Sequence, residues 1–408
     1  MSLRRGQSLQ VKTIMYIPLH HKYRPQTFAH LVGQGAIATT LSNALHQQRI
    51  APAYLFAGAR GTGKTSSARI FAKSLNCTTV GVPTDSPCGV CDICRAITKG
   101  SALDVVEIDA ASNAGVEKIR EVIERAQFAP VQCRYKVYIL DEAHSLSGAA
   151  FNALLKTLEE PPRNVVFILA TTDPQRLLPT IISRCQRYNF QRIDPSAIAR
   201  HLTDIAQQEG ISIHATAVDL IAGLSQGGLR DAQSLLDQLS LLSGEIMPKQ
   251  VYELVGAIPE AALIGLLSAI VHQDEASALE QSRHLTRSGK DALTILQGLA
   301  RMLRDLCLAM AHPQRADLSR VMPSTWQELC ELASQCSRTQ VQRLQTILRE
   351  SEPQIRQSKD AVLWLESLIL EVSSVPDKPV RQPIGNVEVE IKQLSPSSWE
   401  EALASLVY

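Results

Sequence analysis

The residues best suited to chemistry in this sequence lie in a glycine-rich stretch, 58–65, which reads GARGTGKT. The stretch matches the phosphate-binding (Walker A) pattern in full, with an apolar run before it and a helical pattern after it. Glycines let backbone amides face phosphate groups, and the following helix adds its dipole. A turn that matched by chance would lack this context. The sequence therefore predicts ATP bound by Gly58, Gly61, Gly63, Lys64, Thr65 and Ser66.

Two carboxylates complete the predicted nucleotide site. An apolar run, 137–140, ends in Asp141 and Glu142. Asp141 is expected to hold Mg²⁺ through water, and Glu142 is expected to polarise the attacking water. Two acids at a strand end are, taken alone, usually a solvated turn. Hydrolysis becomes the better interpretation because Lys64 is placed to reach the β- and γ-phosphates and the Thr65 hydroxyl to join the Mg²⁺ shell.

Four cysteines form a second candidate site, between the helix after the loop and the next predicted strand: Cys77, Cys88, Cys91 and Cys94. Thiolates two residues apart, in a loop that contains Pro87 and Gly89, can converge on one metal ion. Four sulfur ligands favour Zn²⁺ over hard cations and leave no open position, which indicates a structural site. An iron–sulfur cluster is the chemical alternative. The chain has nine cysteines, an odd number, and a disulfide framework is not expected.

Short apolar runs alternate with helical patterns in the first half of the chain, at 53–56, 105–108, 137–140 and 165–169. This alternation is typical of buried parallel strands in an α/β domain. After about residue 193 the pattern is helical, with leucine, isoleucine and alanine at three- and four-residue spacings. We expect an N-terminal extension at 1–17, an ATPase core at 18–193 with a zinc module at 77–94, a helical lid at 194–257, a helical collar at 258–376 and a linker or tail at 377–408.

The composition sets few limits on partners. The formal net charge is +1, so any contact with nucleic acid must use local basic residues or partner proteins. Hydrophobic residues make up 45% of the chain and aromatic residues 4%, which allows sizeable, mainly aliphatic cores. The sequence has no apolar run long enough to span a membrane, and residues 1–12 lack the apolar centre of a secretory signal. We therefore expect a cytoplasmic protein with no membrane partner.

The order of these motifs resembles that of one family, the gamma/tau subunits of bacterial DNA polymerase III clamp loaders. The similarity extends over about residues 18–376 and includes the segment HKYRP at 21–25, which cups the adenine in this family. The resemblance places Thr172 at the sensor position that orients the hydrolytic water. It places Arg184 in the SRC motif, whose arginine reaches into a neighbouring subunit's nucleotide site. It also places Arg230 on the lid, where the family's arginine contacts the phosphates.

This resemblance implies an AAA+ protein with a RecA-like parallel-sheet ATPase core, a helical lid and an all-α collar. It implies catalysis by Lys64 and Glu142 within one subunit and by Arg184 from its neighbour. The implied assembly is a pentamer of delta, delta-prime and further copies of this chain, which acts on a sliding clamp and primed DNA and contacts a polymerase. ATP binding would open the clamp, and hydrolysis would release it on DNA. Delta-prime subunits commonly lack a working phosphate loop, so the intact Lys64 and Thr65 point to gamma/tau.

Two other interpretations stay open from the sequence. One is a non-motor scaffold of the same fold that organises partner proteins, against which the intact Lys64, Glu142 and Arg184 count. The other is a branch-migration or remodelling ATPase that forms symmetric hexamers, against which the cysteine insertion and the long collar count. Lys118, Arg120 and Arg125 are candidate contacts for DNA phosphates, although a solvated helix face would explain each of them as well.

Overall fold

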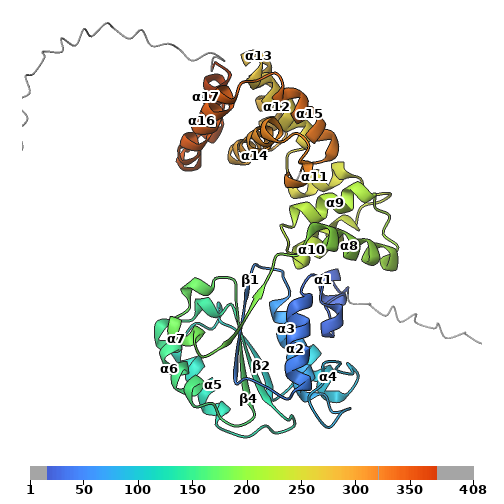
Figure 1. The fold of residues 1–408 in the computed structure, drawn as a ribbon, viewed down its shortest axis with the longest axis vertical. Helices are drawn as coiled ribbons and strands as arrows, with labels where there is room; N and C mark the ends of the chain where they lie inside the picture. The colour runs from blue at the N-terminus through green and yellow to red at the C-terminus, as the bar shows by residue number, and fades with distance from the viewer. Residues whose placement is uncertain (1–15, 320, 375–408) are drawn as a thin grey trace, which may run out of the picture. The chain divides into compact units, whose positions relative to one another are not determined.

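The structure is a computed structural model that describes residues 16–319 and 321–374. It divides the chain into two compact units between Val255 and Gly256 (Figure 1). Most of the predicted N-terminal extension and the whole of the predicted tail at 377–408 lie outside the described residues. The finer predicted boundaries of core, lid and collar stay predictions.

The first unit is built on a five-stranded parallel sheet, which confirms the predicted α/β class. Its strand order is β2-β3-β4-β1-β5. The strands are β1 (Ala53–Gly58), β2 (Val105–Asp109), β3 (Lys136–Asp141), β4 (Val165–Thr171) and β5 (Gln186–Phe190). The three central strands are buried almost throughout, which explains their continuous apolar runs. The edge strand β5 alternates exposed and buried residues and was not among the predicted runs.

Helices cover both faces of the sheet (Figure 1). One layer contains α2 (Gly35–His46), α3 (Lys64–Asn76) and α4 (Asp92–Lys99). The other contains α5 (Val116–Ala126), α6 (Gly148–Glu159) and α7 (Pro179–Ile182). Short elements connect these layers: α1 (Leu19–Lys22) and the 3₁₀ turns Phe28–His30, Ala143–Ser145 and Pro174–Arg176. Side chains alternate between the two layers along each strand, so each face of the sheet has its own core.

A small helical subdomain follows the sheet within the first unit. It contains α8 (Pro195–Glu209), α9 (Ala215–Leu224), α10 (Leu229–Leu239) and α11 (Pro248–Val255). The Asp194 carboxylate caps α8 by accepting a hydrogen bond from the Ser196 amide, and Gly210 ends it at a φ of 67°. These helices enclose their own core, to which Leu19 of α1 contributes. The segment at the start of the described chain is therefore packed on this helical subdomain.

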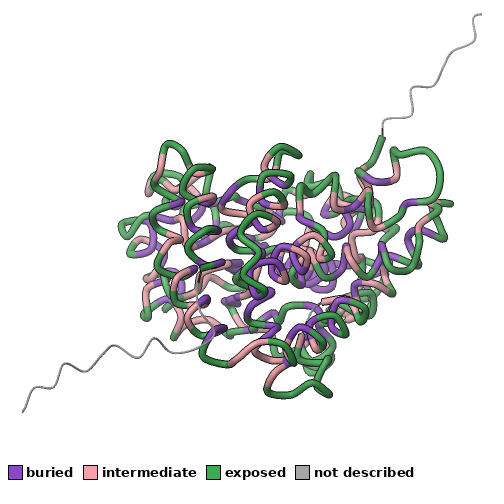
Figure 2. Tube along the Cα trace, turned by 90° about the horizontal axis from the view of Figure 1, so that it is seen from above, coloured by how far each residue is buried: buried purple, intermediate pink, exposed green. Residues whose placement is uncertain are grey.

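The second unit is entirely helical. It contains α12 (Glu260–Val271), α13 (Glu275–Arg287), α14 (Ala292–Ala311), a 3₁₀ turn (Ala316–Leu318), α15 (Pro323–Ala333), α16 (Arg338–Gln357) and α17 (Ala361–Ser373). Its core is aliphatic, as the composition predicts. Figure 2 shows buried and exposed residues interleaved along the chain, as expected for amphipathic elements packed around cores. No single helix among the described residues is long and apolar enough to cross a membrane; α11 and α12 meet that test only as a bent pair.

Two buried charged side chains hold the loop between α5 and β3 at the N-terminal edge of the sheet. The Asp104 carboxylate, 1% exposed, accepts hydrogen bonds of 2.7–3.1 Å from the amides of residues 131–133. The Lys136 ammonium donates to the carbonyls of Arg125 and Phe128 at 3.0 Å each. Burial acts to raise the pKa of Asp104, but the amide bonds, with Lys136 nearby, lower it below its ordinary value.

We predict that Asp104→Asn lowers the free energy of unfolding by ~1–3 kcal/mol at pH 7, because three backbone amides lose a charged, buried acceptor. The depressed pKa makes this contribution complete above about pH 4, and it is lost as the pH falls toward the folded-state pKa. Urea unfolding followed by circular dichroism should show a constant difference from native between about pH 7 and 5. The exposed Asp219→Asn should shift stability by less than ~0.5 kcal/mol. Equal effects of the two substitutions would contradict the stabilising role given to Asp104.

Candidate nucleotide site and cysteine cluster

The phosphate loop connects β1 to α3, as the sequence predicts. The loop ends at Gly63, which has a φ of 100° and directly precedes the first helical residue, Lys64. An L residue rarely adopts this conformation, so glycine is required there. At the start of the loop, a side chain on Gly58 would place its Cβ 2.4 Å from the Phe190 carbonyl oxygen. The glycines at both ends thus let the backbone turn tightly between strand and helix.

Lys64 is buried at the start of α3, with 6% of its surface exposed. Its ammonium donates to the carbonyls of Gly58 (2.9 Å) and Ala59 (2.8 Å). Burial lowers the pKa of Lys64, and the nearby Glu142 and Asp141 oppose that change. Among the described residues the ammonium makes no ion pair with a carboxylate. A phosphate oxygen would offer it a charged acceptor in place of neutral carbonyls.

The predicted magnesium ligands meet in the structure. The Thr65 hydroxyl donates to Asp141 Oδ2 at 2.7 Å, although the two residues come from separate motifs. The other carboxylate oxygen of Asp141 accepts a hydrogen bond from the Glu142 amide at 3.0 Å. A hydroxyl and a carboxylate that already touch form a set of oxygen donors suited to Mg²⁺ beside a phosphate loop.

Glu142 lies at the end of β3 with a φ of 47°, in the left-handed region that non-glycine residues seldom occupy. Such a conformation is found at sites where function fixes the backbone. The Thr172 hydroxyl donates to Glu142 Oε2 at 3.1 Å, so the predicted sensor and the predicted general base are in contact. His144 was missed by the sequence analysis: its Nδ1 lies 3.0 Å from Thr171 Oγ1 and 3.5 Å from Glu142 Oε2.

The two predicted arginines differ in their surroundings. The N-terminus of α10 contacts the phosphate loop, because the Leu229 amide donates to the Gly61 carbonyl at 3.0 Å. Arg230, the next residue, is exposed beside that loop. Arg184, in contrast, donates to the Thr180 carbonyl and pairs with Glu159. The structure therefore brings Arg230 beside this chain's own loop, whereas the partners of Arg184 among the described residues are Thr180, Ser183 and Glu159.

Arg24 was not predicted as a site residue, although it lies in the HKYRP segment. Its Nε donates to Ser66 Oγ at 3.0 Å, in the first turn of α3. Burial lowers the pKa of Arg24, and Arg69 and Arg230 act in the same direction, whereas Glu107 acts against them. The sequence signal that could have identified Arg24 was its position in the HKYRP segment, where it precedes a proline. A second guanidinium group thus lies beside the phosphate loop.

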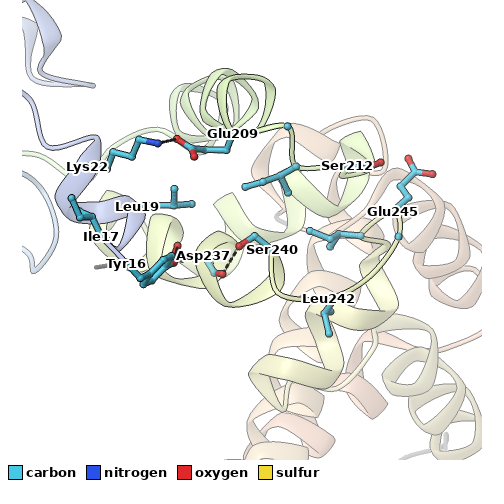
Figure 3. Close-up of a pocket in the computed structure, with 14 residues that line it drawn as sticks. Tyr16, Ile17, Leu19, Lys22, Glu209, Ser212, Asp237, Ser240, Leu242 and Glu245 are labelled. Atoms are coloured by element: carbon cyan, nitrogen blue, oxygen red, sulfur yellow. Dashed lines mark hydrogen bonds and ion pairs between the residues drawn. The ribbon is translucent and has the colours of Figure 1, made fainter. Parts of the chain in front are cut away.

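A cavity of about 720 Å³ lies between the first described residues and the helical subdomain, away from the phosphate loop (Figure 3). Lys22 pairs with Glu209 across it at 2.6 Å, and the Tyr16 hydroxyl donates to Asp237. These contacts attach the segment that carries Arg24 to the lid helices α8 and α10. The same segment thus contacts both the lid and the Walker A helix.

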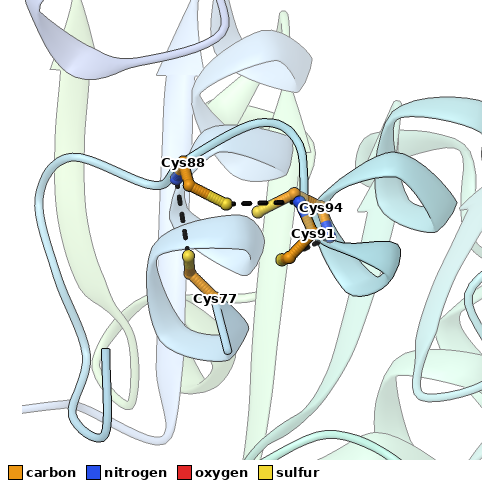
Figure 4. Close-up of side chains that lie close together, drawn as sticks. All are labelled: Cys77, Cys88, Cys91 and Cys94. Carbon is orange, nitrogen blue, oxygen red and sulfur yellow. Dashed lines mark hydrogen bonds between the residues drawn. The ribbon is translucent and has the colours of Figure 1, made fainter. Parts of the chain in front are cut away.

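The four predicted metal ligands converge in the structure (Figure 4). The sulfurs of Cys77, Cys88, Cys91 and Cys94 all lie within 4.8 Å of one another. A tetrahedral site with Zn–S bonds of ~2.3 Å needs sulfurs ~3.8 Å apart, a spacing that sulfurs already within 4.8 Å of one another can reach. Three of the sulfurs accept hydrogen bonds of 3.3–3.4 Å from backbone amides. Hydrogen bonds from the Thr79 side chain and from backbone amides lower the pKa of the Cys88 thiol to about 6.

Comparisons with known proteins agree along the chain. Residues 33–194 match the family described as DNA polymerase III, delta subunit, and residues 197–243 match the DNA polymerase III clamp loader subunit, ATPase lid domain. Residues 246–384 match DNA polymerase III subunits gamma and tau domain III. The DNA polymerase III subunit tau of Bacillus subtilis is 39% identical over 402 residues, 96% of this chain and 70% of that protein. This chain belongs to the gamma/tau family of clamp-loader subunits.

Other relatives of this gamma/tau chain extend beyond the part that matches it. The tau subunit of Escherichia coli is 38% identical over 370 residues, 90% of this chain but 57% of that protein. The solved structure of RuvB from Thermotoga maritima covers 61% of this chain and 79% of its own, at 18% identity and a TM-score of 0.43. That similarity says nothing about activity. The parallel sheet and the family matches confirm the AAA+ core with a helical lid and an all-α collar.

We predict that the purified gamma/tau chain contains one Zn²⁺ per chain, because four thiolates fit a closed tetrahedral site. Cys91→Ser should remove most of the zinc and lower the melting temperature, measured by elemental analysis and thermal unfolding. Cys330→Ser, in the collar, is the matched control and should keep full zinc content. Iron with visible absorbance would support the iron–sulfur alternative, and a native chain free of metal would contradict both.

Proposed function

We propose that this chain is an ATPase subunit of the replicative clamp loader. In this proposal ATP binding opens the sliding clamp for primed DNA, and hydrolysis releases the closed clamp. The observation that carries the proposal is a continuous set of contacts beside the buried Lys64: Thr65 to Asp141, Asp141 to Glu142, and Glu142 to Thr172. A scaffold that only organised partners would not need these groups in contact.

Each residue of this set has a role in phosphoryl transfer. Lys64 would place positive charge on the β- and γ-phosphates, and the amides of the loop would hold the other phosphate oxygens. Thr65 and Asp141 would hold Mg²⁺, which neutralises developing charge between the phosphates. Glu142 would orient and polarise the attacking water, with Thr172 fixing the carboxylate. Zn²⁺ on the four cysteines would stabilise the inserted module and would take no part in this chemistry.

In this proposal the lid couples ATP binding at the phosphate loop to the rest of the subunit. The α10 N-terminus is hydrogen-bonded to the loop through Leu229 and Gly61, and Arg230 follows directly. A triphosphate would attract Arg230 and the Arg24 guanidinium from two different segments of the chain. The lid would therefore take different positions in the empty and ATP-bound subunits, which is what clamp opening requires.

The proposed clamp-loader function also implies partner proteins. Delta and delta-prime subunits and further copies of this chain would complete a pentamer, which would act on the sliding clamp and primed DNA and contact a polymerase. Lys118 and Arg125 both pair with Glu121 on the exposed face of α5, so DNA phosphates would compete with that carboxylate. The cytoplasmic location stays a prediction from the sequence.

We predict that Glu142→Gln preserves ATP binding and lowers the hydrolysis rate about 10²- to 10⁴-fold, because the water loses its base while the loop stays intact. Lys64→Ala should instead abolish binding. Fluorescent-nucleotide binding and steady-state hydrolysis, with and without clamp and primed DNA, separate the two effects. Loss of binding in Glu142→Gln would contradict the assigned role.

Arg184 offers a test of the shared site. Arg184→Ala should lower stimulated hydrolysis about 10³-fold or more if its guanidinium completes a neighbour's site. Arg187→Ala, an exposed arginine nearby on β5, is the control and should hydrolyse ATP normally.

Mixed assemblies then decide between action in trans and in cis. In assemblies of Lys64→Ala and Arg184→Ala chains, an Arg184→Ala site can bind ATP and receive Arg184 from its neighbour, so hydrolysis should partly recover. No recovery would place Arg184 in cis or outside the site. If native hydrolysis stays at background with all partners present, the scaffold interpretation replaces the motor.

A further inference from the structure

Lys73 is a buried ammonium without a carboxylate partner. It lies on α3 with 2% of its surface exposed, and its Nζ donates to Gln26 Oε1 at 2.7 Å. No Asp or Glu in the described part of the chain forms an ion pair with it. A buried charge is strongly unfavourable unless an opposite charge lies nearby. The buried Lys73 ammonium therefore lacks the nearby negative charge that would stabilise it.

The contacts of Lys73 place its ammonium next to α4, near Cys94. The Gln26 Oε1 atom that accepts from Lys73 also lies 3.5 Å from the Thr98 hydroxyl, which donates to the Cys94 carbonyl at 2.9 Å. Burial lowers the pKa of Lys73, and of the charged groups nearby Cys94 acts to raise it, whereas Arg69 and Arg24 lower it further. Arg69 is already neutralised by a bidentate pair with Glu107, and Arg24 bonds to a neutral hydroxyl. Neither arginine can stabilise an ammonium. The cysteine cluster is thus the one neighbour in the described chain that can balance Lys73.

The cluster becomes strongly anionic when it holds a metal. Four thiolates around one Zn²⁺ leave two negative charges in excess, in a partly buried site. Lys73 lies one turn before Cys77, the ligand that directly follows the end of α3, and its carbonyl accepts the Cys77 amide at 2.7 Å. Arg134, another cation beside the cluster, donates its hydrogen bonds to the backbone carbonyls of Leu75, Cys77 and Val80, so these N–H groups are not free to bond to the sulfurs.

We propose that Lys73 is the buried counter-cation of a zinc–tetrathiolate centre, so that zinc binding is linked to the Walker A helix. Gln26 orients the ammonium and also accepts a hydrogen bond from Thr98 of α4, at 3.5 Å. Partners outside the ligand shell that stabilise bound thiolates raise metal affinity. This inference depends on the zinc assignment and not on ATP hydrolysis.

The direct test measures zinc affinity of the full chain by competition with a chromophoric chelator. Lys73→Met keeps the length of the side chain and removes its charge, so affinity should fall about 10- to 100-fold. Lys99→Met makes the same change at an exposed position on α4, in the same module, and should leave affinity within about twofold of native. Equal affinities for native and Lys73→Met would overturn the role of Lys73.

The melting temperature gives a second test, because Lys73→Met should have different effects on it with and without zinc. In the zinc-free protein Lys73→Met removes an uncompensated buried charge, so its melting temperature should equal or exceed the native value. In the zinc-bound protein the same substitution leaves the thiolates unbalanced and should lower the melting temperature. A residue that served only to pack the core would lower both, and that outcome would contradict the proposal.

Gln26→Glu keeps Lys73 and changes an exposed residue, so it tests the idea even if Lys73→Met fails to fold. The new carboxylate would pair with the ammonium and repel the thiolates, and zinc affinity should fall.

In the cobalt-substituted protein, losing the positive charge should move the sulfur-to-metal charge-transfer band to longer wavelength in Lys73→Met. Unchanged affinity in Gln26→Glu and an unshifted band would both count against the counter-cation. A native chain that binds no zinc would overturn it together with the zinc assignment, whatever its ATPase activity.

Discussion

Helix α3 buries two ammonium groups, Lys64 and Lys73, and neither forms an ion pair with a carboxylate in the described part of the chain. Burying a charge without an opposite charge is unfavourable, so an anion bound beside each ammonium would stabilise it. At Lys64 the fold provides the carbonyls of Gly58 and Ala59, which a phosphate oxygen would replace. At Lys73 it provides four thiols that a metal would convert to thiolates. We propose that this one helix lies between two anionic centres, the phosphates of ATP and a zinc–tetrathiolate cluster.

The parallel sheet explains why the nucleotide site forms where it does. β3, β4 and β1 are neighbours, so the residues that follow them meet at the carboxyl edge of the sheet. Asp141 ends β3, Thr172 follows β4, and the phosphate loop follows β1. The opposite edge has a different task, because Asp104 and Lys136 there fix a loop with buried charges.

Much of this site could be predicted from the sequence because its residues follow strands or open a helix. Lys64, Thr65, Asp141, Glu142 and the four cysteines occur in local patterns whose spacing reflects backbone geometry, and the structure brings each group together. Other contacts join segments far apart in the chain. The sequence alone did not pair Arg24 with Ser66 or His144 with Thr171, and it gave no sign that Lys73 is buried. β5 was not predicted because an edge strand needs only one apolar face and therefore lacks a continuous apolar run.

We propose that ATP turnover on this chain places a closed clamp around DNA. The most direct measurement mixes the chain with its delta and delta-prime partners, labelled clamp, ATP and primed circular DNA, and then separates DNA-bound clamp from free clamp by gel filtration. We expect the clamp to stay with circular DNA, to slide off when the DNA is linearised, and to remain free in solution with Lys64→Ala. A clamp that never remains on circular DNA, or that does so equally without ATP, would contradict the account.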